Sequence, residues 1–209
     1  GWPGQEKPSW IGNRCVRWSG ESSPKIRLPN GPNDGGNVLS THLFHDMSPG
    51  GTGAWLLCGM RVVIQRVSRA EVRIDGVVSG AIERGLCILV GIEDEDQRDD
   101  ADWLAAKIAK LRIFNDAEGK IDADLADIEG RVLVVSQFTL HAKTKKGNRP
   151  SFIRAARPEH AVPLYEYFVQ ACQRETGQPV ATGEFGASME VDLVNEGPVT
   201  LWMDTKDKE

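Results

Sequence analysis

The sequence predicts an α+β fold, with antiparallel β-sheets forming a barrel-like core against two long helices. Short strand-like segments recur at uneven intervals, and two longer segments carry apolar residues three and four positions apart, as helices packed on one face do. The regular strand–helix–strand alternation of a parallel α/β protein does not occur. All of these patterns lie beyond Met60, so the chain divides into two unequal parts.

The first part, residues 1–59, is rich in glycine and proline and shows no hydrophobic period. It contains 11 of the 22 glycines and 6 of the 11 prolines. Glycine is too free to favour a helix or strand, and proline lacks the N–H that both need. We expect this leader to be extraneous or flexible, with a targeting extension as the alternative. Residues 60–209 are expected to form a single domain.

Three strand signals open the second part. Residues 61–65 nearly alternate in polarity, which is typical of a strand that is covered on both faces. Residues 71–78 predict a hairpin, because Asp75-Gly76 tolerates the positive φ angles of a tight turn. Residues 85–91 form an apolar run between two glycines and therefore predict a buried strand.

The two helices are expected at Asp96–Leu111 and Pro158–Glu175. Both segments place apolar residues on one face. Pro158 suits the first turn of a helix, where its missing N–H would have no partner. The remaining strands are expected at residues 131–140, 188–194 and 199–203, with the last two joined as a hairpin.

Composition narrows the range of functions. The net charge of -5 means that any RNA partner must be held by a local basic patch. No apolar run approaches the ~20 residues that cross a bilayer, and the sequence begins without a secretory signal's basic and apolar blocks. We therefore expect a cytoplasmic protein that makes no membrane contact. The four cysteines are scattered, so neither a disulfide framework nor a zinc site is expected.

Common catalytic motifs are also missing. There is no Gly-rich phosphate loop, no HExxH and no GxSxG, so we expect neither a metal nor a cofactor. His141 and His160 are the histidines of the second part, and neither has a partner at a characteristic spacing. A Ser-His-Asp triad is therefore a weak interpretation.

Polar residues follow directly where the apolar run 132–135 ends. These residues are Ser136, Gln137, Phe138 and Thr139. Side chains at such a point can line the mouth of a pocket. The alternative is an ordinary strand leaving the core, with Thr and Phe present for their β-propensity.

A basic segment, residues 143–157, comes next. No Asp or Glu occurs anywhere between Arg131 and Pro158. Phosphate binding is the favoured interpretation, with Phe152 available to stack on a base, and a solvated loop that balances acidic neighbours is the alternative. The cations of the segment are Lys143, Lys145, Lys146, Arg149, Arg154 and Arg157.

Two further segments combine small or turn-forming residues. In residues 183–187 small residues flank Phe185, which permits close approach of the backbone to a ligand or a simple bend into a strand. Residues 195–200, Asn-Glu-Gly-Pro-Val-Thr, are typical of a hairpin turn, and the Gly197-Pro198 bond is a candidate for the cis form.

Four motifs, taken in order, resemble the D-aminoacyl-tRNA deacylase family of bacteria and the eukaryotic cytosol. They are residues 65–70 (QRVSRA), 136–140 (SQFTL), 148–152 (NRPSF) and 195–200 (NEGPVT). The resemblance runs from Met60 to about Asp204 and leaves the leader uncovered.

The resemblance implies a homodimeric hydrolase that cleaves the ester bond of tRNA charged with a D-amino acid or glycine. It assigns the catalytic pocket to Ser136, Gln137, Phe138 and Thr139. It implies that Gly197-Pro198 is cis, enters the partner subunit's pocket and rejects L-amino acids through its backbone carbonyls. Hydrolysis is expected to rely on the 2′-hydroxyl of the RNA, with Thr139 as the rival nucleophile.

The remaining contacts with the substrate or tRNA are expected from residues in or beside these motifs. They are Arg66, Lys145, Lys146, Arg149, Phe152, Phe185, Gly186, Ala187 and Asn195. Two other functions stay open: an RNA-binding module without catalysis, and a small-ester hydrolase with Ser136 or Thr139 as its nucleophile.

Overall fold

The computed structural model describes residues 59–145 and 147–208. The expected leader, apart from Gly59, and the expected tRNA contact Lys146 lie outside the described residues. All described residues fall within one unit of the chain, Thr52–Glu209.

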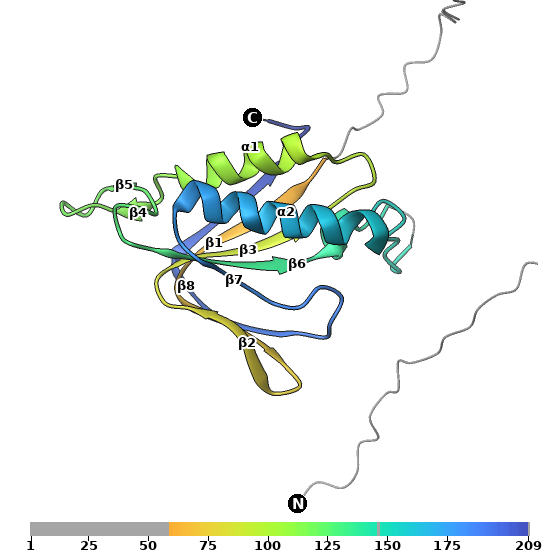
Figure 1. The fold of residues 1–209 in the computed structure, drawn as a ribbon, viewed down its shortest axis with the longest axis horizontal. Helices are drawn as coiled ribbons and strands as arrows, with labels where there is room; N and C mark the ends of the chain where they lie inside the picture. The colour runs from red at the N-terminus through yellow and green to blue at the C-terminus, as the bar shows by residue number, and fades with distance from the viewer. Residues whose placement is uncertain (1–58, 146, 209) are drawn as a thin grey trace, which may run out of the picture. The chain divides into compact units, whose positions relative to one another are not determined.

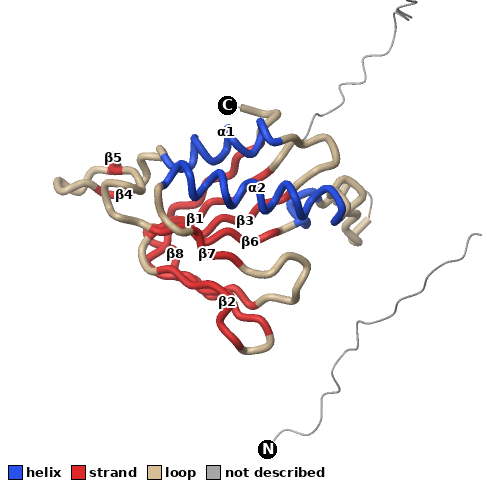
Figure 2. Tube along the Cα trace, viewed as in Figure 1, coloured by secondary structure: helices blue, strands red, loops and turns tan. Residues whose placement is uncertain are grey.

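One large sheet carries two helices on one face (Figures 1 and 2). Its strands lie in the order β2-β1-β3-β6-β7, with β8 paired to the other side of β1. A small hairpin, β4-β5, stands apart from it. The elements are β1 (Arg61–Ile74), β2 (Val77–Ile82), β3 (Gly85–Gly91), α1 (Arg98–Ala109), β4 (Phe114–Asn115), β5 (Ile121–Ala123), β6 (Arg131–Ser136), the 3-10 helix η1 (Phe138–His141), α2 (Pro158–Thr176), β7 (Val180–Thr182) and β8 (Glu190–Asp204).

The α+β class with two helices and a nearly closed barrel is confirmed, but the sheet is mixed and not purely antiparallel. β1 is antiparallel to β2, β3 and β8, whereas β6 is parallel to both β3 and β7. The cause lies in the connections: α1 lies between β3 and β6, and α2 lies between β6 and β7, so each strand returns in the direction of the one before it.

The barrel nearly closes where β2 meets β7. A Cβ added at Gly80 would lie 2.5 Å from the carbonyl oxygen of Thr182, so the two backbones are in direct contact there. One apolar core fills the space between the sheet and the helices, and it includes Phe168 and Cys172. A second core, which includes Cys87, lies inside the barrel. Both cysteines are buried core residues.

Local signals predicted the hairpin and the helices well. Asp75 and Gly76 have φ angles of 49° and 78° in the β1–β2 turn. Helix α1 begins after Gln97, whose backbone N–H donates to the Asp100 carboxylate, and Pro158 opens α2. Within the described residues, no helix is both long enough and apolar enough to span a membrane.

Two expectations about strands were wrong. The strand expected at residues 131–140 ends at Ser136, and the chain turns into η1. The hairpin expected after residue 194 does not form, because β8 continues in one direction and pairs with β1 on both sides of residues 196–199. Asn195 lies opposite Val67 and Thr200 opposite Gln65, so the residues between them, here called the β8 bulge, form a protrusion in one long strand.

Candidate active site

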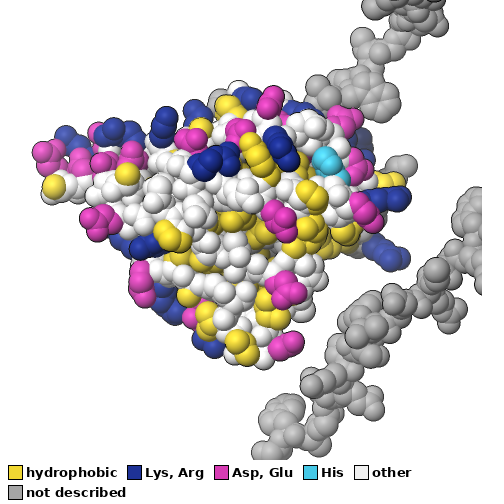
Figure 3. All heavy atoms as spheres, in the orientation of Figure 1, with side chains coloured by type: hydrophobic (Ala, Val, Ile, Leu, Met, Phe, Trp, Pro, Cys, Tyr) yellow, Lys and Arg dark blue, Asp and Glu magenta, His cyan; other side chains and the backbone are white. Residues whose placement is uncertain are grey.

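A pocket of about 260 Å³ opens at the carboxyl end of β6. Figure 3 shows apolar side chains gathered beside α2, over the end of β6 and the segment that follows β7. None of the described residues that line the pocket has an ionisable side chain. The lining residues are Val90, Ile92, Val135, Ser136, Gln137, Phe138, Ala156, Ala161, Phe185, Gly186, Ala187, Met189 and Val191.

The floor of the pocket is formed where β6 stops. The backbone N–H of Gln137 donates to the carbonyl of Val90 at 2.6 Å, which holds the end of β6 against β3. The chain then tightens into η1, and the Gln137 side-chain amide donates to the Thr139 hydroxyl at 2.6 Å. The carbonyl of Leu140 accepts a hydrogen bond from Arg61 at 3.0 Å. The turn that carries Ser136, Gln137, Phe138 and Thr139 is therefore fixed to the sheet.

The opposite wall comes from the segment between β7 and β8. Phe185 packs edge-on against the Tyr165 ring, with 5.6 Å between ring centroids. Tyr165 is anchored in turn, because its hydroxyl donates to the carbonyl of Val134 at 2.9 Å and burial raises its pKa to about 12. Gly186 has a φ of +79°, which lets the chain bend around the pocket.

The fold thus brings two distant motifs together. Ser136, Gln137 and Phe138 share one pocket with Phe185, Gly186 and Ala187. The sequence did not single out Met189 and Val191, which also line it. Their only signal was the alternation of residues 188–194, and that alternation does not distinguish a pocket wall from a core.

The basic segment begins beside the pocket rim. Lys143 and Ser151 exchange backbone hydrogen bonds of 2.8 and 3.0 Å, which close a loop whose Lys145 and Arg149 are exposed. Phe152 is 37% exposed and packs edge-on against Phe138, which is 54% exposed, with 5.1 Å between ring centroids. Since Phe138 lines the pocket, the exposed aromatic pair connects the pocket with the basic segment.

The β8 bulge is held by hydrogen bonds within the chain. Asn195 donates from Nδ2 to Gln65 at 2.7 Å, and its Oδ1 accepts the N–H of Val199 at 3.0 Å. The bond between Gly197 and Pro198 is cis. The Asn195 side chain is therefore used in shaping the bulge.

Arg66 also holds the β8 bulge and does not line the pocket. Its side chain is buried, with only 5% of the residue exposed. The guanidinium donates to the carbonyl of Glu196 at 3.0 Å and to the carbonyl of Ile113 at 2.6 Å. Arg66 was expected to contact the substrate or tRNA, but within this chain it positions the bulge.

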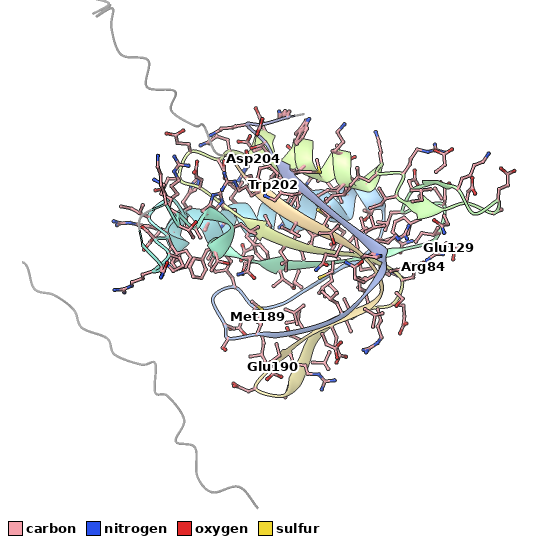
Figure 4. All side chains as sticks on the ribbon, turned by 180° about the vertical axis from the view of Figure 1, so that it is seen from behind. Arg84, Glu129, Met189, Glu190, Trp202 and Asp204 are labelled. Atoms are coloured by element: carbon pink, nitrogen blue, oxygen red, sulfur yellow. The ribbon has the colours of Figure 1, made fainter. Side chains whose placement is uncertain are left out.

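The pocket and the β8 bulge lie at opposite ends of the barrel. Met189 lines the pocket, whereas Arg84 lies beside the bulge, 3.4 Å from the Glu196 carboxylate. Figure 4 shows these two labelled residues far apart. The bulge lies level with Gly85, and the pocket is lined by Val90, so they are separated by roughly 16 Å along β3. One chain therefore does not combine the two features in a single site.

Comparisons with known proteins agree with this architecture. The family model described as D-Tyr-tRNA(Tyr) deacylase matches residues 63–204. The D-aminoacyl-tRNA deacylase of Bacteroides fragilis (strain YCH46) is 58% identical over 150 residues, which are 72% of this chain and all of that protein. The D-aminoacyl-tRNA deacylase of Akkermansia muciniphila is 57% identical over the same coverage.

Two solved structures share the fold. A c-Myc DNA Unwinding Element Binding Protein aligns with a TM-score of 0.64 at 38% identity, covering 68% of this chain and 97% of that one. A probable eukaryotic D-amino acid tRNA deacylase aligns with a TM-score of 0.61 and covers 69% of this chain and 98% of that one. At 19% identity, this second likeness supports the fold alone.

The relatives named D-aminoacyl-tRNA deacylase and the matching family model place the chain in a class of hydrolases that act on the aminoacyl-tRNA ester bond. The chain belongs to the D-Tyr-tRNA(Tyr) deacylase family, which confirms the resemblance of its motifs.

Proposed function

We propose that the chain hydrolyses the ester bond of D-aminoacyl-tRNA, and of mischarged glycyl-tRNA, to release the amino acid and tRNA. The observation that carries the proposal is the pocket. The family-like motif at residues 136–138 meets residues 185–187 in it, and its described lining contains no ionisable group. A site of this kind suits a substrate that is already an activated ester.

Catalysis in such a pocket depends on positioning and on hydrogen-bond donors. In a 3-10 turn the first N–H groups have no partner within the turn, so those of Phe138 and Thr139 can donate to a developing oxyanion. The 2′-hydroxyl of the terminal ribose lies next to the ester and supplies the nucleophilic or proton-transfer assistance that the pocket lacks. The Gln137 amide engages the Thr139 hydroxyl and keeps this turn in one conformation.

Chiral selection is assigned to the β8 bulge of the partner subunit. The separation between pocket and bulge within one chain supports this arrangement, because a second subunit can insert its bulge where the first cannot. Arg66 and Asn195 hold the bulge, so its backbone carbonyls cannot retreat to admit an L side chain. Glycine has no side chain to reject, so glycyl-tRNA is also a substrate.

A homodimer is supported by an apolar row on the sheet face opposite the helices. Trp202 pairs with Val63, Val63 with Leu89, and Leu89 with Val135, so the four side chains lie on one face. Trp202 is 53% exposed at one end of the row, and Val135 lines the pocket at the other. Packing two copies on this face would cover the exposed Trp202 and the partly exposed Val63 and Leu89.

The tRNA is proposed to contact the basic segment. Its exposed cations and the lack of Asp and Glu within the segment give a local positive patch on an acidic chain. Phe152 connects this patch to the pocket rim, so the acceptor end of the tRNA can reach both. We also propose a cytoplasmic location, where charged tRNA is used, and residues 60–209 as the active domain, with the leader not required.

The test is a deacylation assay with D-tyrosyl-, L-tyrosyl- and glycyl-tRNA. We expect release of D-tyrosine and glycine, and little release of L-tyrosine. Binding of tRNA without hydrolysis would favour the RNA-binding module. Trapping of an acyl-enzyme on Ser136 or Thr139 would favour the small-ester hydrolase.

A further inference from the structure

His141 is a buried histidine that the proposed catalysis does not use. It ends η1, two residues after Thr139, and is only 1% exposed. Its ring lies against Gly91, where an added Cβ would be 3.0 Å from both Cδ2 and Nε2 of the imidazole. The same Cβ would lie 3.0 Å from the carbonyl oxygen of Gln137. The end of β3 is therefore in close contact with both the imidazole and Gln137, the residue before η1.

The other ring nitrogen faces a carboxylate. Nδ1 of His141 lies 3.9 Å from Oε1 of Glu93, whose side chain is largely buried. Both ring nitrogens are buried without a hydrogen-bond partner among the described residues, and Nδ1 faces the Glu93 carboxyl group, so a proton on either group decides whether the two attract. Burial lowers the pKa of His141 and raises the pKa of Glu93, so it shifts each group toward its neutral form.

Glu93 also holds the other side of the pocket. Its backbone forms an antiparallel bridge with Ala155, and the N–H of Ala156 donates to the carbonyl of Ile92 at 2.9 Å. Ala156 lines the pocket, and Ala155 belongs to the basic segment. Glu93 therefore contacts two parts of the site. Its backbone pairs with the basic segment, and its side chain faces His141 at the end of η1.

We propose that His141 and Glu93 form a positioning pair for the deacylation reaction, holding the Gln137–Leu140 turn in register with β3 and the basic segment. The inference rests on the proposed function and adds two residues to it. Neither residue touches the substrate. They act through the N–H groups of Phe138 and Thr139, whose placement relative to the ester sets the rate.

Other charged groups surround the pair and act on its titration. Arg61 approaches from β1, Arg154 from the basic segment, Asp204 from β8, and Glu95 and Lys206 from the loop before α1 and the C-terminal tail. The cations oppose a positive imidazole, so protonating His141 as well as Glu93 disturbs the packing. A purely space-filling ring would show no such response to pH.

The experiment compares His141→Phe, which keeps a ring without nitrogens, with His141→Gln, which keeps a donor and an acceptor but does not titrate. Glu93→Gln removes the carboxylate. His160→Gln is the matched control, because His160 hydrogen-bonds only the backbone carbonyl of Asp96, at 3.0 Å. For D-tyrosyl-tRNA, we expect kcat of His141→Phe to fall by about tenfold to a hundredfold, with KM changed by less than about twofold. His141→Gln should recover part of the loss, and the control should stay within about twofold of wild type.

Two further readouts separate positioning from folding. The effects of His141→Phe and Glu93→Gln should be non-additive, because removing either member disables the pair. The ratio of wild-type kcat to that of His141→Gln should fall as pH is lowered, while the ratio to His160→Gln stays flat. The inference is overturned if the ratio of wild-type to variant kcat does not change with pH for either variant. It is also overturned if the substitutions lower the melting temperature and leave kcat unchanged. An inactive wild type overturns the proposed function itself, so the two failures are distinct. If His141→Phe does not fold, His141→Gln and Glu93→Gln decide the question.

Discussion

The hydroxyl of Thr139 accepts a hydrogen bond from the Gln137 amide and is only partly exposed, which suits a structural part of the turn better than a nucleophile. We therefore expect Thr139→Ala to retain activity within about tenfold of wild type, whereas loss of a covalent nucleophile commonly costs several orders of magnitude. The measurement is kcat for D-tyrosyl-tRNA, with melting temperature as the control. A collapse of kcat in a folded variant would assign the nucleophile to Thr139.

Gly197 allows a sharper test of chiral selection. Its φ is +126°, and an added Cβ would lie 2.8 Å from Nη2 of Arg66, so Gly197→Ala must move the β8 bulge or the Arg66 guanidinium that holds it. Gly119 is the matched control: its φ is +80°, but an added Cβ meets nothing within 4 Å. Both substitutions should destabilise by about 1–3 kcal/mol through backbone strain.

Only Gly197→Ala should change the ratio of D- to L-tyrosyl-tRNA deacylation, with lower activity on the D-substrate and weaker rejection of the L-substrate. The ratio is measured at a temperature where both variants are folded. Equal ratios in Gly197→Ala and Gly119→Ala would remove the selector role from the bulge.

At the scale of elements, the basic segment should determine the salt dependence of tRNA binding. Lys145 and Arg149 are both exposed, so replacing them with Ala removes up to two phosphate contacts. The slope of log affinity against log salt should then decrease by up to about 2 units. Lys107 and Lys110, exposed at the end of α1, are a control pair of equal charge. Equal slopes for the two double variants would place the RNA elsewhere.

Elements fixed by local chemistry could be predicted from the sequence, and those fixed by distant partners could not. Asp75-Gly76 favours its turn through its own backbone preferences, and Pro158 suits the first turn of a helix. In contrast, residues 196–199 have the composition of a hairpin turn, yet β1 pairs on both sides of them and makes them a bulge. The parallel pairing of β6 is equally a result of where α1 and α2 carry the chain.

The same distinction holds for the candidate site. Ser136 and Gln137 belong to a recognisable motif and Phe185 lies between small residues, so all three could be nominated before the fold was known. Met189 lines the same pocket, but it is one apolar residue in an alternating strand and has no local signature. Arg66 lies in a motif, but its contact with the carbonyl of Glu196 depends on a pairing across 130 residues.

For the whole molecule, Asp96 links stability to pH. Its side chain is buried, one oxygen accepts the Glu93 N–H at 2.8 Å, and burial raises its pKa from 3.8 to about 7. Between these values the folded chain holds a proton that the unfolded chain releases, so stability from this group falls as pH rises from about 4 to about 7. The amide in Asp96→Asn cannot ionise, so this variant does not lose stability at this position as pH rises.

We therefore expect the difference in melting temperature, Asp96→Asn minus wild type, to increase from about pH 5 to about pH 8. Asp99→Asn, exposed in the first turn of α1, should show a constant difference. A constant difference for Asp96→Asn as well would mean that its carboxyl group is not protonated in the folded chain.

A site that combines the pocket of one subunit with the β8 bulge of the other predicts that two defective variants complement each other. A site within one chain does not predict this. Ala187→Trp should fill the pocket and leave the bulge intact, while Gly197→Ala should disturb the bulge and leave the pocket intact. Each variant alone should lose most, but not all, of its activity on D-tyrosyl-tRNA, because both sites of its homodimer contain one defective part. In a mixed dimer, the intact pocket of one subunit meets the intact bulge of the other, and the second site contains both defects.

Random pairing after unfolding and refolding the two variants together should restore about a quarter of wild-type activity on D-tyrosyl-tRNA, because half of the dimers are mixed and each has one good site. If every chain used its own bulge, all mixed dimers would be as inactive as their parents. The measurement is the deacylation rate of the refolded mixture against that of each variant refolded alone, and no recovery in a mixture shown to contain mixed dimers would contradict the composite site.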